Sequence, residues 1–261
     1  MRFPGATSVT EAPLITRVRH ELRRRRLTAM HVEDRPAGMR RVILAGDELA
    51  GFISLGFDDH MKLLFADGAD GTVMRDFTPR RFDPEKAELW IDFFLHDAGP
   101  AAAWAKEVKP GATIEVGGPR GSSVISPDGI DCHLLIGDET ALPAIERRLD
   151  ELGAATRAMV LLEIDAHAER ATLTSKAALD VACVSHASVE SEGASALLTT
   201  LRDIRLPPKR CFAWVAHETQ TARAVRAHLH DERGFDKKWI KAAGYWRRGA
   251  SGAHEKIDET E

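Results

Sequence analysis

The pattern of hydrophobic and polar positions divides the chain into two parts. From about Arg26 to Ser126, apolar runs are short and are separated by turn sequences such as "DRPAG" and "DGADG". Short runs with frequent turns are typical of antiparallel strands. Several such strands in succession predict a small β-barrel.

The segment "AELWIDFFLHD" is the clearest strand, and its two faces differ. One is a plain core face, made of Leu89, Ile91, Phe93 and Leu95. The other mixes rings, a carboxylate and an imidazole, from Trp90, Asp92, Phe94 and His96. A simple core would not select the second set, so this face is a candidate ligand surface.

After Pro127 the pattern changes to alternating strands and helices. The strand-like runs are "CHLLIG", "RAMVLLEID", "DVACVSH", "CFAWVAH" and "WIKAAGYWRRG". Helical runs separate most of them, among them "DETALPAIERRLDELG" and "ETQTARAVRAHLHDERG". This alternation predicts an open parallel sheet covered by helices. Ligands of such sheets bind outside the carboxyl ends of the strands.

Two turns lead from a strand into a helix, "LIGDETALPA" and "WVAHETQTA". Free N–H groups at a helix N-terminus attract anions. Any such turn also needs residues that cap the helix. The sequence leaves both interpretations open for each turn.

We therefore expect a two-domain chain with four segments. These are a tail over residues 1–20, an antiparallel β-barrel domain over 21–127, an α/β domain with an open parallel sheet over 128–250, and a polar tail over 251–261.

Composition narrows the function classes. The net charge of −4 argues against general nucleic-acid binding, which needs a basic surface. We interpret the basic run Arg23–Arg26 as a solvated helix face or strand entry, and binding of an anion or a membrane surface is the alternative. No stretch approaches the roughly 20 apolar residues that span a bilayer. The N-terminal sequence lacks the apolar segment of a secretory signal, so we expect a cytoplasmic protein.

The metal-binding residue types show no metal-binding pattern. The three cysteines, Cys132, Cys183 and Cys211, lie far apart in sequence and form no CxxC pair. This predicts neither a disulfide nor an iron–sulfur cluster. The 11 histidines form no zinc-binding spacing, so no metal site is predicted.

The stretch "RDFTPRRF" combines residue types that a cofactor site uses. In a strand, Arg75 and Phe77 share one face and Thr78 lies on the other, until Pro79 ends the pairing. An arginine can hold a pyrophosphate, and an aromatic ring can stack on a flat cofactor. A charged edge strand closed by a proline explains the same residues.

Together with later segments, this stretch resembles the siderophore-interacting protein family, which consists of flavin-dependent ferric-siderophore reductases related to the ferredoxin reductases. "RDFTPR" matches the family pattern Arg-x-Tyr-Thr-x-Arg, except that Phe77 replaces the tyrosine. "FFLHDAGPAAAWA" is similar to the family's second flavin segment and "GGPRGS" to its next loop. "LLIGDETALPAI" is similar to the nicotinamide-side turn and "GYWRRG" to the C-terminal signature. The resemblance covers roughly residues 27–250 and implies a ferredoxin reductase-like fold, with a flavin-binding barrel before a nicotinamide-binding α/β domain.

The resemblance implies roles for individual residues toward FAD and NAD(P)H. Arg75 would contact the FAD pyrophosphate, Phe77 would pack on the isoalloxazine or ribityl chain, and Thr78 would lie near flavin N5. The other implied cofactor residues are Asp92, Phe94 and His96 along the cofactor, Gly99, Pro100 and Ala101 at the phosphates, and Asp138, Glu139 and Thr140 where nicotinamide meets flavin. Any hydrogen bond that the family makes through the tyrosine hydroxyl is in doubt at Phe77.

The expected substrate is a ferric siderophore, commonly an anionic chelate, which requires cations near the flavin edge. Following the family, we assign Lys62, Arg247 and Arg248 to this role and count them with Thr78 as catalytic. An ordinary surface cation is the alternative for each of the three.

The implied reaction passes electrons from NAD(P)H through FAD to chelated Fe(III) and releases Fe(II). Hard oxygen ligands favour Fe(III), so reduction loosens the chelate. Two other functions stay open, a reductase of free flavin or of an electron carrier, and a non-enzymatic flavin- or siderophore-binding module. Because the chain lacks GxGxxG, a partner protein as electron donor also stays open.

Overall fold

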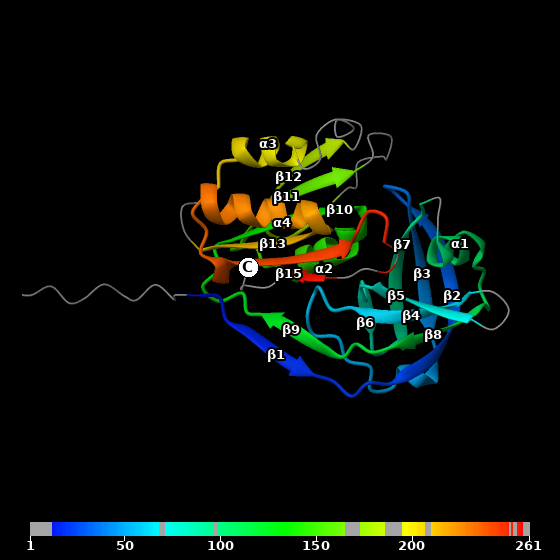
Figure 1. Cartoon of the computed structure of the whole chain (residues 1–261). Helices are drawn as coiled ribbons and strands as arrows, with labels where there is room; N and C mark the ends of the chain where they lie inside the picture. The colour runs from blue at the N-terminus through cyan, green and yellow to red at the C-terminus, as the bar shows by residue number, and fades with distance from the viewer. Residues whose placement is uncertain are drawn as a thin grey trace, which may run out of the picture.

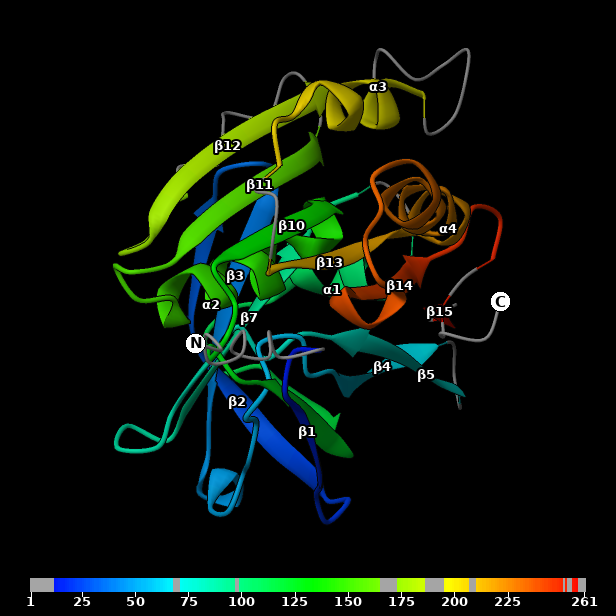
Figure 2. The same cartoon turned by 90° about the vertical axis from the view of Figure 1, so that its left-hand side faces the viewer.

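The computed structural model has two packed units, each built on its own β-sheet (Figures 1 and 2). It describes residues 12–67, 71–96, 99–164, 173–185, 195–206, 210–250, 252 and 255–257.

The first unit is a seven-stranded antiparallel sheet in the order β5-β4-β8-β2-β3-β7-β6. Its strands are β2 (Arg24–Arg35), β3 (Met39–Ala45), β4 (Met61–Asp67), β5 (Gly71–Phe77), β6 (Arg81–Asp83), β7 (Glu88–Phe94) and β8 (Thr113–Gly117). The short helix η1 (Asp47–Leu49) follows β3, and α1 (Pro100–Glu107) follows β7. In α1, the ring centroid of Trp104 lies 5.9 Å from that of Phe65 and 5.4 Å from that of Phe93. These aromatic contacts attach the helix to the core of this first unit, which we call the barrel unit.

A separate pair of strands, β1 (Ile15–Arg19) and β9 (Gly121–Ile125), corrects the expected N-terminal tail. They pair antiparallel, with Ile15 opposite Ile125 and Arg19 opposite Gly121. Gly121 permits this pairing, because a Cβ atom there would lie 2.5 Å from the carbonyl oxygen of Val18. The tail prediction was wrong for Ile15–Arg19 because the partner strand lies about a hundred residues away, so no local pattern reveals it.

The second unit is a six-stranded sheet in the order β12-β11-β10-β13-β14-β15, parallel except for β15. Its strands are β10 (Cys132–Asp138), β11 (Arg157–Ile164), β12 (Ala178–Ser185), β13 (Cys211–Glu218), β14 (Ile240–Trp246) and β15 (Glu255–Ile257). Its helices are α2 (Leu142–Glu151), α3 (Ser195–Asp203) and α4 (Thr219–Ala227), with short helical turns η2 (Glu139–Ala141), η4 (His228–Glu232) and η5 (Lys237–Trp239).

β15 corrects the expected polar C-terminal tail. It pairs antiparallel with β14, and Ile257 is buried opposite Ala242. Glu255 accepts a hydrogen bond from Arg223 on α4. One apolar residue and one ion pair therefore hold a segment whose composition is otherwise polar.

Helices cover both faces of the second sheet, as the sequence pattern predicted. α3 and α4 pack on one face through Leu197, Leu201 and Val225. α2 packs on the other face, where its core cluster also includes Met39 and Phe57 of the barrel unit. The α2 layer therefore lies between the two units (Figure 1).

Polar contacts also join the units. Arg80 donates to Glu146 (2.9 Å) and to Asp150 (2.8 Å) on α2. Arg147 donates to the carbonyl oxygen of Pro79 and to Ser54, each at 2.8 Å. The second arginine of "RDFTPR" is therefore an interface residue between the barrel and α2.

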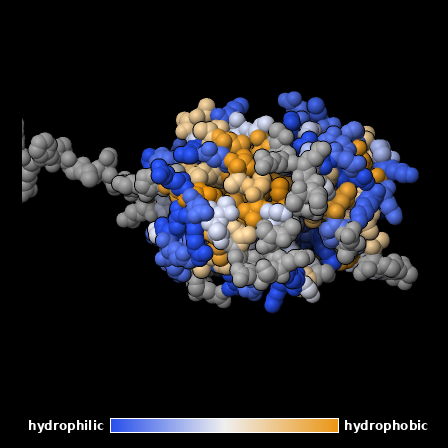
Figure 3. Space-filling view, turned by 90° about the horizontal axis from the view of Figure 1, so that it is seen from above, coloured by the Kyte–Doolittle hydropathy of each residue, from blue (hydrophilic) through white to orange (hydrophobic). Residues whose placement is uncertain are grey.

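The face of the molecule that carries α3 and β12 points away from the barrel unit. Seen from above, it has hydrophobic residues in the middle and hydrophilic residues toward both sides (Figure 3). Val181 on the edge strand β12 is among the exposed hydrophobic residues. Among the described residues, no helix is long and apolar enough to cross a membrane.

Candidate flavin and nicotinamide site

Arg75 and Thr78 lie at the end of β5, on the side of the barrel that meets the second unit. Arg75 pairs with Leu63 across the sheet, and its Nη1 donates to the Met74 carbonyl oxygen (2.9 Å). The guanidinium packs beside Gly252, where a Cβ atom would lie 3.2 Å from Nη1. Thr78 follows the strand and is buried. The C-terminal segment of the chain therefore comes close to the first predicted phosphate ligand.

The Phe77 ring is half-buried in the barrel. Its centroid lies 4.6 Å from that of Phe93 and 6.2 Å from that of Phe65. Part of the Phe77 ring surface therefore packs against other rings of the barrel core.

Asp92 has a different environment from the one predicted. It is buried, and both of its oxygens accept hydrogen bonds of 2.7 Å from Arg41. Arg41 Nη2 also lies 3.6 Å from Glu146 of α2. The carboxylate on the mixed face of β7 is therefore part of an ion-pair network between the units, and direct contact with a cofactor is not supported.

Phe94 and His96 form an aromatic surface where β7 ends. Their ring centroids lie 6.1 Å apart, and His96 is exposed. A Cβ atom at Gly99 would lie 3.6 Å from His96 Cε1, so this surface borders the start of α1.

The N-terminus of α1 is the uncapped helix start beside these residues. Gly99 stands at the N-cap with φ of 100°, Pro100 is the first helical residue, and no side chain caps the helix. The positive φ favours glycine at this position. Uncapped N–H groups at a helix N-terminus suit a phosphate.

Carboxylates occupy the corresponding turns of the second unit. Asp138, at the end of β10, accepts from the backbone N–H of Thr140 (2.9 Å) and from its hydroxyl (2.5 Å). Glu218, at the end of β13, accepts from the N–H groups of Gln220 (2.7 Å) and Thr221 (3.1 Å). Each turn is therefore capped by its own carboxylate, and these N–H groups are not offered to an anion.

A buried acidic cluster extends along the same edge. Trp246 Nε1 donates to Asp138 (2.7 Å), and His217 Nε2 lies 2.9 Å from Glu163 Oε2. The backbone N–H of Glu218 donates to His217 Nδ1 (2.8 Å), so the neutral imidazole carries its proton on Nε2. Glu139 is buried beside this cluster and Thr140 is half-buried. The cluster fixes the strand ends against one another.

Tyr245 connects this edge to the flavin motif, and the sequence assigned it no role. Its phenol forms a hydrogen bond with the Thr78 side chain. Burial and the nearby carboxylates of Asp58, Asp138 and Asp59 raise the pKa of the phenol well above its usual value. The residue belongs to "GYWRRG", so the motif carried the signal although only its two arginines were assigned.

The three predicted substrate cations lie on different elements. Lys62 on β4 forms a 2.5 Å ion pair with Asp76 and remains 43% exposed. Arg247 and Arg248 are exposed in the turn after β14, where the Arg248 N–H lies 3.4 Å from Glu218 Oε1.

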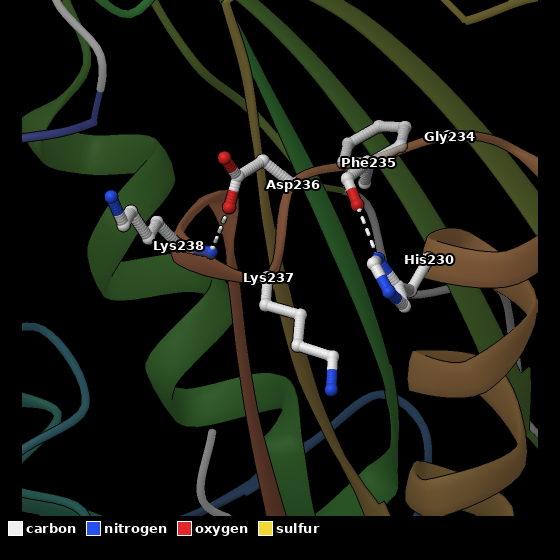
Figure 4. Close-up of a pocket in the computed structure, with 6 residues that line it drawn as sticks. All are labelled: His230, Gly234, Phe235, Asp236, Lys237 and Lys238. Carbon is white, nitrogen blue, oxygen red and sulfur yellow. Dashed lines mark hydrogen bonds between the residues drawn. The ribbon is translucent and has the colours of Figure 1, made fainter. Parts of the chain in front are cut away.

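A cavity of about 580 Å³ lies away from all these residues (Figure 4). It is lined by His230, Gly234, Phe235, Asp236, Lys237 and Lys238. Asp236 accepts from the Lys238 N–H (2.9 Å), and His230 Nδ1 bonds the Phe235 carbonyl oxygen (2.8 Å). These residues precede β14, whereas Tyr245 lies at its carboxyl end, so the cavity belongs to the opposite edge of the sheet.

Two family models match the chain. A siderophore-interacting FAD-binding domain matches residues 28–72 and 66–123, and a siderophore-interacting protein model matches residues 130–249. The NADPH-dependent ferric-chelate reductase of Escherichia coli is 32% identical over 88% of this chain and 95% of that protein. The chain belongs to the siderophore-interacting protein family.

Solved structures agree with this membership. A siderophore utilization protein from T. fusca superposes with a TM-score of 0.83 at 31% identity, over 92% of this chain and 98% of that one. A ferredoxin NADP+ reductase from Neisseria gonorrhoeae superposes with a TM-score of 0.56 at 13% identity, over 80% and 91%. The second likeness shows the fold alone, and it confirms the predicted ferredoxin reductase-like architecture.

The residues of this family member fit FAD by their donor chemistry. Arg75 provides a guanidinium and α1 an uncapped N-terminus preceded by Gly99, and both suit a pyrophosphate. Phe94 and His96 offer ring surfaces next to that helix start. Among the described residues, no cluster of histidine, cysteine, aspartate and glutamate could hold a metal ion.

Proposed function

We propose that this protein is a flavin-dependent reductase of ferric siderophores that takes electrons from NAD(P)H. The observation that carries the proposal is the contact between the units, where Thr78 of the flavin motif meets Tyr245 at the carboxyl edge of the parallel sheet. Family membership supports both the flavin and the siderophore. A reductase of this type works inside the cytoplasm, where NAD(P)H is found.

FAD, when bound, supplies the step that converts two-electron hydride chemistry into single-electron transfer. Arg75 and the N-terminus of α1 hold the phosphates. Thr78 hydrogen-bonds the ring edge, and Phe94 and His96 cover ring surface. The packed interface of α2 with the barrel keeps the two units in a fixed arrangement.

The substrate enters as an anionic chelate of Fe(III). Lys62, Arg247 and Arg248 raise its local concentration by electrostatic attraction. No acid–base pair is needed, because electron transfer to the iron changes no bond to carbon and loosens the oxygen ligands by itself.

An anaerobic absorbance experiment tests this function. The purified protein is loaded with FAD, NADPH is added, and an anionic ferric siderophore of the catecholate or carboxylate class follows, with an Fe(II)-specific chromophoric chelator present. Bleaching of the flavin by NADPH, recovery with the siderophore and stoichiometric Fe(II) are expected. A protein that takes up no FAD, or reduced flavin that the siderophore does not reoxidise, contradicts the proposal.

A partner protein is the second candidate for the electron donor. The observation in its favour is that Asp138 and Glu218 already bind the N–H groups of Thr140 and Gln220, so these N–H groups are not offered to a pyrophosphate. In that case the flavin ignores NADPH and NADH, yet chemically reduced flavin is still reoxidised by the siderophore.

A further inference from the structure

Tyr245 occupies an irregular position in β14. The pairing with β13 runs from His217 opposite Gly244 directly to Glu218 opposite Trp246. Tyr245 is therefore the extra residue of a β-bulge, a feature that redirects a side chain and is frequent next to active sites. Here the bulge directs the phenol out of the sheet toward Thr78 of the barrel.

The surroundings leave the ring little freedom. On one side of it in sequence, a Cβ atom at Gly244 would lie 2.4 Å from Thr219 Oγ1, so the backbone is tightly packed there. On the other side, Trp246 is held by its hydrogen bond to Asp138 and by its carbonyl oxygen, which accepts from Thr219 (3.1 Å).

The ring itself packs edge-on against Trp214, with centroids 6.0 Å apart and an interplanar angle of 86°. Trp214 is in turn fixed by its indole N–H, which donates to Asp58 of the barrel unit (2.8 Å). The phenol of Tyr245 is thus held from both units.

We propose that Tyr245 is a positioning residue, whose phenol sets the direction of the Thr78 hydroxyl at the reactive edge of the flavin. This rests on the proposed function, in which Thr78 hydrogen-bonds that edge. A hydroxyl has one donor and two acceptor sites, so two bonded hydroxyls can present either a donor or an acceptor by reversing both O–H bonds. A ring nitrogen that accepts a hydrogen bond in the oxidised cofactor and donates one in the reduced cofactor needs both O–H directions.

The phenol acts here as a hydroxyl and not as a base. Its raised pKa keeps it protonated at every working pH, so it does not ionise during turnover. Replacing Tyr245 by Phe therefore removes a hydrogen bond and leaves the charge of the site unchanged.

The test is a double-mutant cycle of Tyr245→Phe and Thr78→Val on the FAD-loaded protein. Three quantities are measured: FAD dissociation by fluorescence, the flavin midpoint potential by dye equilibration, and the rate of flavin bleaching by NADPH. For Tyr245→Phe we expect a bleaching rate reduced about fivefold, the worth of one hydrogen bond, with a shifted potential and little change in FAD affinity. The double variant is expected to match Thr78→Val alone.

Val225→Ala on α4 is the control for lost stability, because it truncates a buried side chain on the face of the sheet opposite the barrel. The proposal is overturned if Tyr245→Phe leaves the potential and the bleaching rate unchanged, if its effect multiplies with that of Thr78→Val, or if Val225→Ala reproduces it. Failure of the proposed function is separate, since the wild-type protein would then bind no FAD or would not reduce the chelate. If NADPH does not reduce the wild-type flavin, a dithionite-reduced dye is used to bleach it in place of NADPH. The flavin midpoint potential of Tyr245→Phe then decides whether the proposal holds.

Discussion

At the scale of single residues, the predicted site residues fall into two groups. Some side chains remain partly exposed, and others have their polar atoms bound to residues of the protein itself. Arg75 and Asp92 were predicted from the same resemblance, yet only Asp92 has both polar atoms bound to one buried partner. Residue type and spacing cannot distinguish these cases, because the partner Arg41 lies 51 positions away. Exposure and partners decide which candidates keep a role.

Arg75→Ala is expected to weaken FAD binding by about tenfold or more, since a charged hydrogen bond to phosphate is lost. Equilibrium titration followed by flavin fluorescence measures the change. Arg81→Ala is the matched control. Arg81 directly follows the "RDFTPR" motif, is exposed, and pairs with Asp83. Equal affinity in wild type and Arg75→Ala would remove Arg75 from the site.

His133 gives a pH prediction. Burial, and secondarily the charge of Arg148, lower the pKa of its imidazole to about 3. As the pH falls below about 6.5, the unfolded imidazole binds a proton that the folded one does not, so the free energy of unfolding decreases. Between about pH 6.5 and 4.5 this contribution amounts to about 2 kcal/mol.

Chemical denaturation across that pH range measures the loss. His133→Gln, which cannot titrate, should show a flatter pH dependence than wild type. His31→Gln on the exposed part of β2 is the matched control for the effect of a His-to-Gln exchange. Identical slopes for wild type and His133→Gln would contradict the assignment.

At the scale of elements, the sequence predicted most of the strands and helices, because both rely on local periodicity. It missed β1 and β15, whose stability comes from pairing with distant strands. It also treated Cys132 and Cys211 as unrelated, although β10 and β13 place them directly opposite one another. These strand pairs depend on the order of strands in the sheet, and the spacing of residues along the sequence does not predict that order.

The β5–β6 connection carries a prediction at this scale. Arg80 is largely buried between Glu146 and Asp150, whereas Asp150 is mostly exposed. Arg80→Ala should lower the free energy of unfolding by about 2 kcal/mol, because Glu146 loses a hydrogen bond to a largely buried guanidinium and keeps only longer contacts, such as that with Arg41. Asp150→Ala should cost less than about 1 kcal/mol, as is usual for exposed pairs. Urea unfolding compares the two, and equal losses would show that Arg80 does not hold α2 to the barrel.

At the scale of the whole molecule, the candidate site exists only because the two units pack against each other. The sequence identified the motif on each side, but the contact of Tyr245 with Thr78 depends on the bulge in β14 and on the α2 layer, neither of which follows from a pattern. The same placement separates the substrate cations, since Lys62 belongs to the barrel and Arg247 and Arg248 to the second sheet.

This division makes the electrostatics of the whole chain testable. With a net charge of −4, the protein repels an anionic chelate at long range, so local cations must reverse the field near the site. Lys62→Ala should raise the KM for an anionic ferric siderophore about threefold at low salt, with unchanged FAD content and a smaller effect at high salt, where charges are screened.

Steady-state kinetics at two ionic strengths check this expectation, with Lys109→Ala as the control for loss of an exposed lysine elsewhere on the barrel. Because Lys62 pairs with Asp76, its removal also uncovers a negative charge, and Lys62→Ala/Asp76→Asn separates the two effects. If the double variant recovers the wild-type KM, the lysine acts by neutralising Asp76. If the KM stays raised, the lysine itself attracts the chelate, and a KM unaffected by either variant would leave that task to Arg247 and Arg248.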